Sequence, residues 1–226
     1  MSAFDFQKAG VSPSVSAPRP LRRLTLLLAV ILPLLLASCG INQPAPVKQT
    51  YLLQVAPPSN RANAAPKPVS LKVSSVSVGA PFRGRSIVFR EAEFRYQSDF
   101  YDEYFIPPSA MLADAVASWL GSARIFREVL PTGSGAQADY LLEGFTGALY
   151  ADIRDAAKPA AVLEIKFLLT DASSGAVVWN HDYAQRVTMA NASADAFASA
   201  MNQALGQLLT ELGGELANLR LPAPPG

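Results

Sequence analysis

The clearest pattern in the chain is a strict alternation of apolar and polar residues in its second half. Residues 162–170 have an apolar side chain at every second position, which is typical of a strand with one buried and one solvated face. Residues 177–189 repeat the alternation after the short turn at residues 173–175. With a strand region at residues 139–153, these segments predict an antiparallel meander.

Shorter apolar runs predict further strands in the first half. A first strand is expected at residues 50–55, before a loop that contains four prolines. Apolar residues change phase within a second strand at 69–78, which predicts a bulge near Ser74 and Ser75. Three short strands are expected at residues 86–90, 93–97 and 125–130.

Helical spacing of apolar residues occurs in two places. One helix is predicted to begin at the Pro107-Pro108-Ser109 sequence, with Ser109 as N-cap, and to run to Gly121. The second spans residues 193–219 and has apolar residues three or four positions apart. Its apolar stripe consists of Phe197, Met201, Leu205, Leu208, Leu212, Leu216 and Leu219. We interpret this stripe as the cover of a sheet in preference to a coiled-coil or partner-binding face.

These elements predict an α+β (mixed α/β) fold. We expect a mostly antiparallel sheet with two main helices packed on one face, in a single domain. This domain covers residues 50–219, and a proline-rich tail follows at residues 220–226.

The first forty residues have a different pattern. Arg19, Arg22 and Arg23 precede the apolar run 24–37, which as a helix would be only about 21 Å long and is short for a membrane span. The run ends in Leu36-Ala37-Ser38-Cys39-Gly40, which resembles the bacterial lipoprotein box. An export signal with a chance cysteine is the alternative. A twin-arginine signal lacks the expected continuation after the arginine pair.

The lipoprotein interpretation divides this part of the chain. Residues 1–38 form the signal peptide, and residues 39–49 form the lipidated Cys39 with a short tether. Cys39 would carry a covalent diacylglyceryl group and an N-acyl chain, which together give a firm anchor. In the lipoproteins that this segment resembles, a residue other than Asp after the cysteine goes with outer-membrane localisation. Gly40 therefore predicts a lipid anchor in the outer membrane, with the domain on the periplasmic face.

Composition argues against several functional classes. Lys and Arg total 19 against 18 Asp and Glu, a formal charge of +1, so no overall charge favours nucleic acid. One cysteine and one histidine, His181, provide neither a disulfide nor a Cys–His catalytic pair. Residues 133–135 lack the lysine of a phosphate loop, and the acidic residues at 99, 102 and 103 lack calcium-loop spacing. We therefore expect no enzyme, no metal and no cofactor other than the anchor lipid.

The strongest candidate for a partner surface is the aromatic-rich segment 94–108, which follows a group of arginines. Aromatic residues concentrate at protein interfaces, although part of this set could fill the core between strands and helix. The arginines could form a cationic stripe or only a solvated hairpin face. The candidate partner-binding residues are Tyr96, Phe100, Tyr101, Tyr104, Phe105, Arg83, Arg85 and Arg90.

Several sequence motifs together resemble a known family. They are the lipoprotein box, the Tyr-Leu-Leu of residues 51–53, the Leu-x-Val-x-x-Val-x-Val of residues 71–78, the segment 85–90, and the FYDEYFIPP of residues 100–108. This order is similar to that of the ABC-type transport auxiliary lipoprotein family, whose members include PqiC-like outer-membrane lipoproteins. The better-known branch has an Arg-Trp pair before the first helix, where this sequence has residues 104–108.

The resemblance implies a non-catalytic subunit of a transport system for lipids or other hydrophobic compounds. Such systems combine an ATPase, an inner-membrane permease and a periplasmic protein with a mammalian-cell-entry (MCE) domain. The lipoprotein would dock on the ring formed by the MCE protein, from the outer-membrane side. A ring-shaped partner would also be compatible with a homo-oligomer.

Two alternatives stay open at this point. One is a periplasmic lipid carrier that holds an acyl chain between the final helix and the sheet. The other is an outer-membrane activator of an envelope enzyme, which the short tether disfavours because a distant inner-membrane partner needs a longer flexible segment.

Overall fold

The computed structural model describes residues 47–58 and 65–222, which belong to one compact unit. The predicted signal peptide, Cys39 and the tether up to residue 46 lie outside the described residues, as do residues 223–226. None of the helices in the described ranges is long and apolar enough to cross a membrane.

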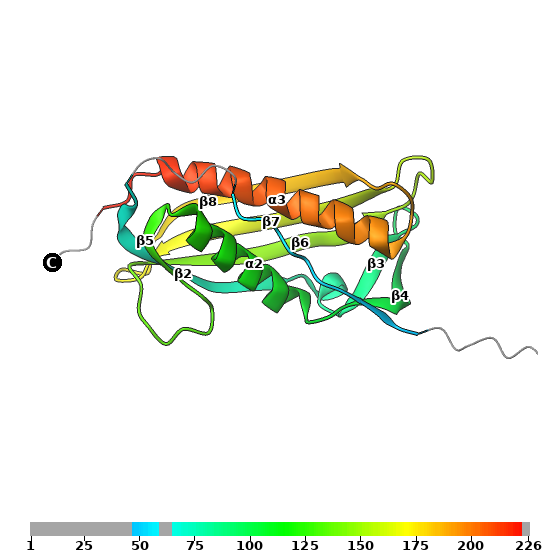
Figure 1. Ribbon diagram of the computed structural model, residues 1–226, viewed down its shortest axis with the longest axis horizontal. Helices are drawn as coiled ribbons and strands as arrows, with labels where there is room; N and C mark the ends of the chain where they lie inside the picture. The colour runs from blue at the N-terminus through cyan, green and yellow to red at the C-terminus, as the bar shows by residue number, and fades with distance from the viewer. Residues whose placement is uncertain (1–46, 59–64, 223–226) are drawn as a thin grey trace, which may run out of the picture. The chain divides into compact units, whose positions relative to one another are not determined.

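The secondary structure confirms an α+β fold with eight strands and two α-helices (Figure 1). In chain order the elements are β1 (Gln49–Tyr51), β2 (Lys67–Val78), the 3-10 turn η2 (Ala80–Phe82), β3 (Ser86–Arg90), β4 (Tyr96–Tyr104), α2 (Pro108–Ala123), β5 (Phe126–Leu130), β6 (Tyr140–Asp152), β7 (Ala160–Asp171), β8 (Val177–Thr188) and α3 (Ala194–Asn218).

Strand β6 organises the sheet because it pairs with three other strands. One edge of β6 pairs antiparallel with β7 along its whole length, and β7 pairs antiparallel with β8, which confirms the predicted meander. The other edge of β6 pairs parallel first with β2 and then, near its end, with β3. The sheet is therefore mixed, and its longest ladders are the antiparallel ones. The parallel pairs of β6 with β2 and β3, of β2 with β5, and of β1 with β4 were not predicted.

Helices α2 and α3 lie together on one face of the sheet, as predicted (Figure 1). α2 lies against β2 and β5, whereas α3 lies against β7 and β8. The stripe of α3 is buried from Phe197 to Leu216, which confirms its interpretation as the cover of the sheet. At Gly213 an added Cβ would stand 2.6 Å from the Trp119 ring, so this glycine permits the close approach of the two helices.

The helix ends differ in how they are capped. In α3 the hydroxyl of Ser193 accepts a hydrogen bond from the backbone N–H of Ala196 at 3.2 Å. In α2 the N-cap is Pro107 and Pro108 is the first helical residue, so the prediction that Ser109 is the N-cap is wrong by two positions. Pro108 fits there because the first N–H groups of a helix need no intrahelical acceptor and the proline ring presets φ.

Two predicted strands have different bounds in the structure. The strand expected at 50–55 ends at Tyr51, because the next residues cross the helices and bond to their side chains. There the N–H of Leu53 donates to Met111 Sδ at 3.2 Å, and that of Gln54 to Asn202 Oδ1 at 2.7 Å. The strand expected at 93–97 lies further along the chain, as β4. In β2 the register shifts between Val73 and Ser75, which confirms the predicted bulge.

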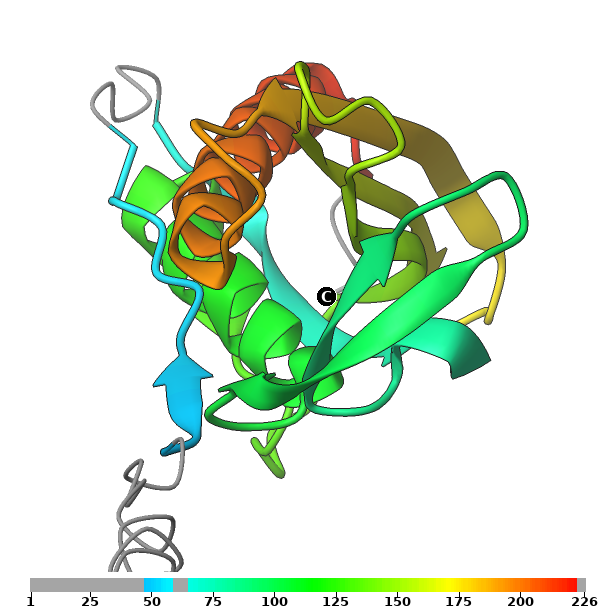
Figure 2. The same ribbon diagram turned by 90° about the vertical axis from the view of Figure 1, so that its right-hand side faces the viewer.

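The face of the sheet opposite the helices is only partly covered. Near the ends of β6 and β8 the β3–β4 hairpin crosses it (Figure 2), and the Tyr150 ring stacks on Phe82 at 5.6 Å and meets Tyr96 edge-to-face at 5.6 Å. Closer to the start of β6 this face is more open, and Phe145 is 50% exposed. The hairpin thereby places β4, with its aromatic residues, at one end of the molecule.

Candidate functional site

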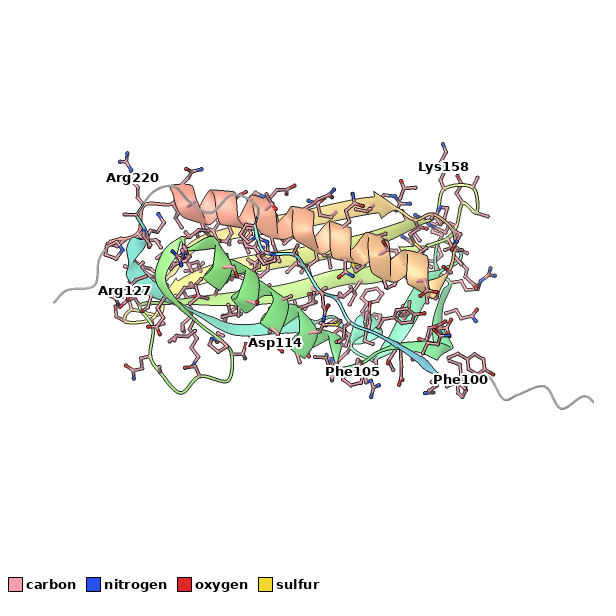
Figure 3. The ribbon with its side chains drawn as sticks, in the orientation of Figure 1. Phe100, Phe105, Asp114, Arg127, Lys158 and Arg220 are labelled. Atoms are coloured by element: carbon pink, nitrogen blue, oxygen red, sulfur yellow. The ribbon has the colours of Figure 1, made fainter. Side chains whose placement is uncertain are left out.

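Most of the predicted partner-binding residues lie at the surface. Phe100 is 72% exposed and Phe105 is 57% exposed, which is unusual for large apolar side chains (Figure 3). Both lie at the end of the molecule where β1 pairs with β4. The exposed members of the predicted set are Arg83, Arg85, Tyr96, Phe100, Tyr101 and Phe105. We refer to Phe100, Tyr101 and Phe105 as the aromatic surface.

A bulge in β4 fixes two of the three side chains of the aromatic surface. The register between β3 and β4 jumps from the pair Val88 and Ser98 to the pair Ser86 and Glu103, which leaves extra residues on β4. The carboxylate of Asp99 accepts hydrogen bonds from the backbone N–H groups of Tyr101 at 2.7 Å and Asp102 at 2.9 Å. The extra residues are therefore held in a defined turn and are not a loose loop.

Within this bulge Phe100 and Tyr101 contact each other edge-to-face. Their ring centroids are 5.1 Å apart, with an angle of 86° between the planes. This is a favourable geometry for two aromatic rings, and it orders both side chains before any partner is bound. The bulge therefore presents a preorganised aromatic pair to the surface.

Cationic side chains flank the aromatic pair. The Lys48 ammonium lies 5.3 Å from the centre of the Phe100 ring and 3.5 Å from Glu103 Oε2. Arg85 Nη2 lies 2.7 Å from Glu103 Oε1, and its Nε donates to the carbonyl of Tyr104 at 2.8 Å. Exposed ion pairs of this kind contribute little stability. Their effect is to hold Lys48 beside the Phe100 ring and to hold Arg85 at Glu103, on the same strand as Phe100.

A partly buried hydrogen bond supports β4 from the side of β1. Tyr51 donates its hydroxyl to Asp102 Oδ1 at 3.2 Å. Burial and the negative charges of Asp102 and Asp195 raise the pKa of Tyr51 to about 12, so this donor stays protonated at neutral pH. Burial, with the charge of Asp99, also raises the pKa of Asp102 above its ordinary value.

Tyr104 is a correction to the predicted surface. As the last residue of β4 it points into the core and is only 2% exposed, so it cannot contact a partner in this conformation. Burial raises the pKa of its hydroxyl far above the ordinary value, and this hydroxyl has no hydrogen-bond partner among the described residues. The alternation along the strand, which directs neighbouring side chains to opposite faces, explains its inward orientation.

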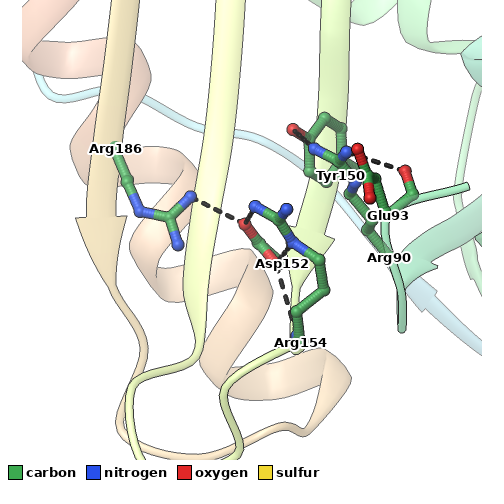
Figure 4. Close-up of polar contacts among 6 residues, drawn as sticks. All are labelled: Arg90, Glu93, Tyr150, Asp152, Arg154 and Arg186. Atoms are coloured by element: carbon green, nitrogen blue, oxygen red, sulfur yellow. Dashed lines mark hydrogen bonds and ion pairs between the residues drawn. The ribbon is translucent and has the colours of Figure 1, made fainter.

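Arg90 and Tyr96 hold the hairpin to the sheet. The Arg90 guanidinium lies 5.4 Å from the Tyr96 ring centre and 5.8 Å from that of Tyr150. Its Nη1 donates to the Tyr150 hydroxyl at 3.3 Å and its Nη2 to the carbonyl of Glu93 at 2.8 Å (Figure 4). Arg83, by contrast, has no ion pair or side-chain hydrogen bond within the described part of the chain.

Beside Arg90 lies a charged cluster that the sequence analysis missed. Asp152 is 2% exposed and accepts bonds from Arg154 Nε at 2.9 Å, Arg154 Nη2 at 2.7 Å and Arg186 Nη1 at 2.9 Å (Figure 4). Hydrogen bonds from these guanidinium groups hold the pKa of Asp152 well below its usual range. In the sequence this cluster is visible only as Asp152 two residues before Arg154, a pattern too common in surface strands to indicate a buried carboxylate.

The remaining chemical candidates lie far apart in the fold. The His181 ring packs on Trp179 and Tyr183 on β8, and its Nδ1 lies 3.4 Å from Glu215 Oε2 of α3. Asp99 and Glu103 bind backbone N–H groups and cations, as described above. Residues 47–58 and 65–222 contain no group of three His, Cys, Asp or Glu side chains that could hold a metal ion.

The space proposed for an acyl chain beneath the final helix is filled by side chains. Phe197, Met201 and Leu208 of α3 have no exposed surface and pack in the same core as Phe167 of β7. A hollow of about 430 Å³ instead lies beside α2, where Leu52, Val55 and Met111 contribute to its lining. The described structure therefore does not favour a groove between α3 and the sheet.

Comparisons with known proteins agree on the fold. The chain is similar to a protein of Xanthomonas campestris at 24% identity, with a TM-score of 0.66, covering 74% of this chain and 95% of that chain. It is also similar to the crystal structure of an uncharacterized protein at 16% identity, with a TM-score of 0.60, covering 75% and 99% of the two chains. The chain matches no curated protein.

The family assignment comes from the sequence itself. A family model described as the ABC-type transport auxiliary lipoprotein component matches residues 51–213, from β1 into α3. This range contains nearly all of the sheet, both helices in large part, and the aromatic surface. The chain therefore belongs to the family of ABC-type transport auxiliary lipoprotein components.

Proposed function

We propose that this chain is a non-catalytic lipoprotein subunit of an ABC-type transport system for lipids or other hydrophobic compounds, anchored in the outer membrane. Its role is to dock the periplasmic MCE-domain protein of that system, which in turn works with an inner-membrane permease and an ATPase. The observation that carries this proposal is an exposed, preorganised aromatic pair in a chain of this family.

The chemistry of the aromatic surface supports a protein partner. Protein interfaces derive much of their binding energy from a few aromatic and arginine side chains that are rigid before binding. Phe100 and Tyr101 fit this description because the Asp99 bulge and their mutual contact order both rings. Exposed Phe105 extends the surface, and Lys48 and Arg85 supply a cationic rim.

The position of the anchor supports docking close to the membrane. Cys39 precedes Val47 by eight residues, a length of chain that spans at most about 28 Å. Val47 is directly followed by Lys48, which lies over the Phe100 ring. The aromatic surface would therefore lie within a short distance of the membrane that holds the lipid on Cys39. A partner that crosses the periplasm would meet the lipoprotein there.

A capture experiment tests the docking role. Tagged full-length protein is purified from detergent-solubilised envelope, and co-purifying proteins are identified by mass spectrometry. We expect the MCE-domain protein, the permease and the ATPase to be recovered with the wild type. Their recovery should fall at least tenfold with Phe100→Ala combined with Tyr101→Ala. Phe145→Ala is the matched control, because Phe145 is also a half-exposed aromatic residue but lies on the open face of the sheet.

Two outcomes would contradict the proposal. Wild-type recovery of none of these components would reject the docking role itself. Full recovery with the Phe100 and Tyr101 double variant would reject the aromatic surface as its site, provided that the variant has the wild-type circular dichroism spectrum. A third hypothesis, the envelope-enzyme activator, predicts recovery of that enzyme instead.

The anchor is tested separately. Intact-mass and peptide analysis of the mature protein should find Cys39 as the first residue, bearing a diacylglyceryl group and an N-acyl chain. Cys39→Ala should leave the protein unprocessed and lower its yield in the washed outer-membrane fraction by at least tenfold. A mature N-terminus at another residue would overturn this part of the proposal.

A further inference from the structure

The three strands that form edges of the sheet differ in length. β1 has three residues and β5 has five, but β8 has twelve and pairs only with β7. Proteins usually keep edge strands short or obstruct them with proline or a bulge, because unpaired backbone groups can bind another strand. β8 contains no proline, and its register with β7 runs without a shift from Ala160 to Leu169.

The register also shows which groups of β8 face away from β7. The N–H of Met189 donates to the carbonyl of Pro159 at 2.8 Å, so odd-numbered residues of β8 direct their backbone groups to β7. Even-numbered residues direct theirs to the free edge, and within the described residues none of these groups has another backbone partner. The even-numbered residues along this free edge are Asn180, Asp182, Ala184, Arg186 and Thr188, and all five are exposed.

We propose that this edge binds β8 of a second copy of the chain, antiparallel and centred on Ala184. A two-fold axis at Ala184 places Ala184 opposite its own counterpart and Asp182 of each copy opposite Arg186 of the other. Asn180 then lies opposite Thr188. The sequence of the free edge is thus complementary to itself, and directly opposed unlike charges stabilise an antiparallel pair.

Other registers of the same pair are less favourable. A shift of the axis to residue 182 would place two Asp182 side chains opposite each other, and a shift to residue 186 would do the same for two Arg186 side chains. Directly opposed like charges destabilise a strand pair. Only the register centred on Ala184 places Asp182 of each copy directly opposite Arg186 of the other, and the small side chain of Ala184 also leaves room at the axis.

The two charged residues can still accept a second partner. Asp182 is 75% exposed, and its single ion pair joins Oδ2 to Lys166 Nζ at 3.4 Å. Arg186 is 54% exposed and uses only Nη1 for Asp152. On the helix side of β8, Gln185 donates to Glu211 at 2.9 Å and His181 lies beside Glu215. Glu211 and Glu215 on this side of β8 therefore each already have a partner within their own chain.

This contact is independent of the proposed docking function. It uses the free edge of β8, whereas docking uses the aromatic surface of β4, so one can fail while the other holds. Together the two would give a lipoprotein that presents two aromatic surfaces from one dimer.

Cysteine cross-linking tests both the contact and its register. Full-length protein in native membranes is treated with a mild oxidant and run on a non-reducing gel. Ala184→Cys should give a disulfide-linked dimer, because opposed residues of such a pair have Cα atoms about 5.5 Å apart. Thr188→Cys should not, since its two copies would lie about 26 Å apart along the strands. Asn180→Cys combined with Thr188→Cys should cross-link again.

Charge reversal provides the second measurement. Asp182→Arg in the Ala184→Cys background should weaken the dimer about tenfold, because it places two pairs of arginines opposite each other. Asp182→Asn should have a smaller effect. A monomer with Ala184→Cys in a folded protein would overturn the proposal. Equal cross-linking with Ala184→Cys and with Thr188→Cys alone would also overturn it, since such a result indicates random collision.

Discussion

The stripe of α3 and the aromatic surface of β4 are similar in apolarity but opposite in environment. Phe197 on α3 has no exposed surface, whereas Phe100 on β4 is 72% exposed. The stripe repeats every three or four residues, so all its side chains fall on one face and pack together against the sheet. On β4, Phe100 and Tyr101 are adjacent, and a regular strand cannot bury two neighbouring side chains on the same face.

This difference shows that spacing, more than apolarity, determines which large side chains enter the core. On β4 the bulge at Asp99 shifts the alternation and keeps Phe100 and Tyr101 outside, while Tyr104 returns to the interior. Aromatic residues whose spacing does not follow the two-residue period of their own strand are therefore expected to lie partly at the surface. The following four predictions test this contrast in order of decreasing effect.

The largest effect is expected from Phe197→Ala. Removing a fully buried aromatic ring leaves a cavity and should lower the free energy of unfolding by about 3–5 kcal/mol. Phe100→Ala, at the exposed position, should change it by less than about 0.5 kcal/mol. Urea denaturation followed by circular dichroism measures both. Similar losses for the two variants would show that the aromatic surface is part of the core.

Asp152→Asn should have the next largest effect. It leaves Arg154 and Arg186 without their carboxylate and should lower the free energy of unfolding by about 2 kcal/mol at neutral pH. Because the folded-state pKa of Asp152 is depressed, its contribution is present above the unfolded pKa of about 3.9 and is lost as the pH falls toward the folded value.

The difference between wild type and Asp152→Asn should therefore shrink as the pH is lowered below about 4. Asp114→Asn is the control, because Asp114 is exposed on α2 and has no ion pair within the described residues (Figure 3). A difference between wild type and Asp152→Asn that does not change with pH would contradict the electrostatic explanation.

The contact between the two helices gives a smaller effect with an internal control. In Gly213→Ala the new methyl group would stand 2.6 Å from the Trp119 ring, so α2 and α3 must separate, at a cost of about 1–2 kcal/mol. In Gly214→Ala the methyl group meets no atom within 4 Å, and the helix should become more stable by up to about 1 kcal/mol. Thermal unfolding of the two variants should thus shift in opposite directions.

The elements that could be predicted from the sequence are those with a regular period. The meander of β6, β7 and β8, the helix α3, and the bulge in β2 followed from spacing alone. The parallel pairing of β2 with β6 could not be predicted from the sequence. The chain between these two strands passes through the β3–β4 hairpin and α2, and such a long connection leaves no local signal of the pairing. The length of β1 was overestimated because the backbone N–H groups of Leu53 and Gln54 bond to side chains of the helices and not to another strand.

The site was predictable only in outline. The aromatic segment was recognised from composition, but the exposure of Phe100 and the burial of Tyr104 depend on a bulge that one carboxylate stabilises. The cluster at Asp152 joins strands that are not neighbours in sequence, so its charges have no recognisable spacing. The family resemblance, by contrast, was visible in short motifs, and the match over residues 51–213 confirms it.

The smallest effect on stability, and the sharpest test of the aromatic surface, is expected from Asp99→Ala. This change removes the acceptor for two backbone N–H groups on an exposed bulge and should cost about 0.5–1 kcal/mol. Asp99→Asn keeps one acceptor oxygen and should cost less. Neither variant removes an aromatic ring, so any loss of partner capture must come from loss of preorganisation. We expect capture to fall severalfold with Asp99→Ala and to be largely retained with Asp99→Asn. Wild-type capture by both variants would show that the partner binds the rings without needing the bulge to order them first.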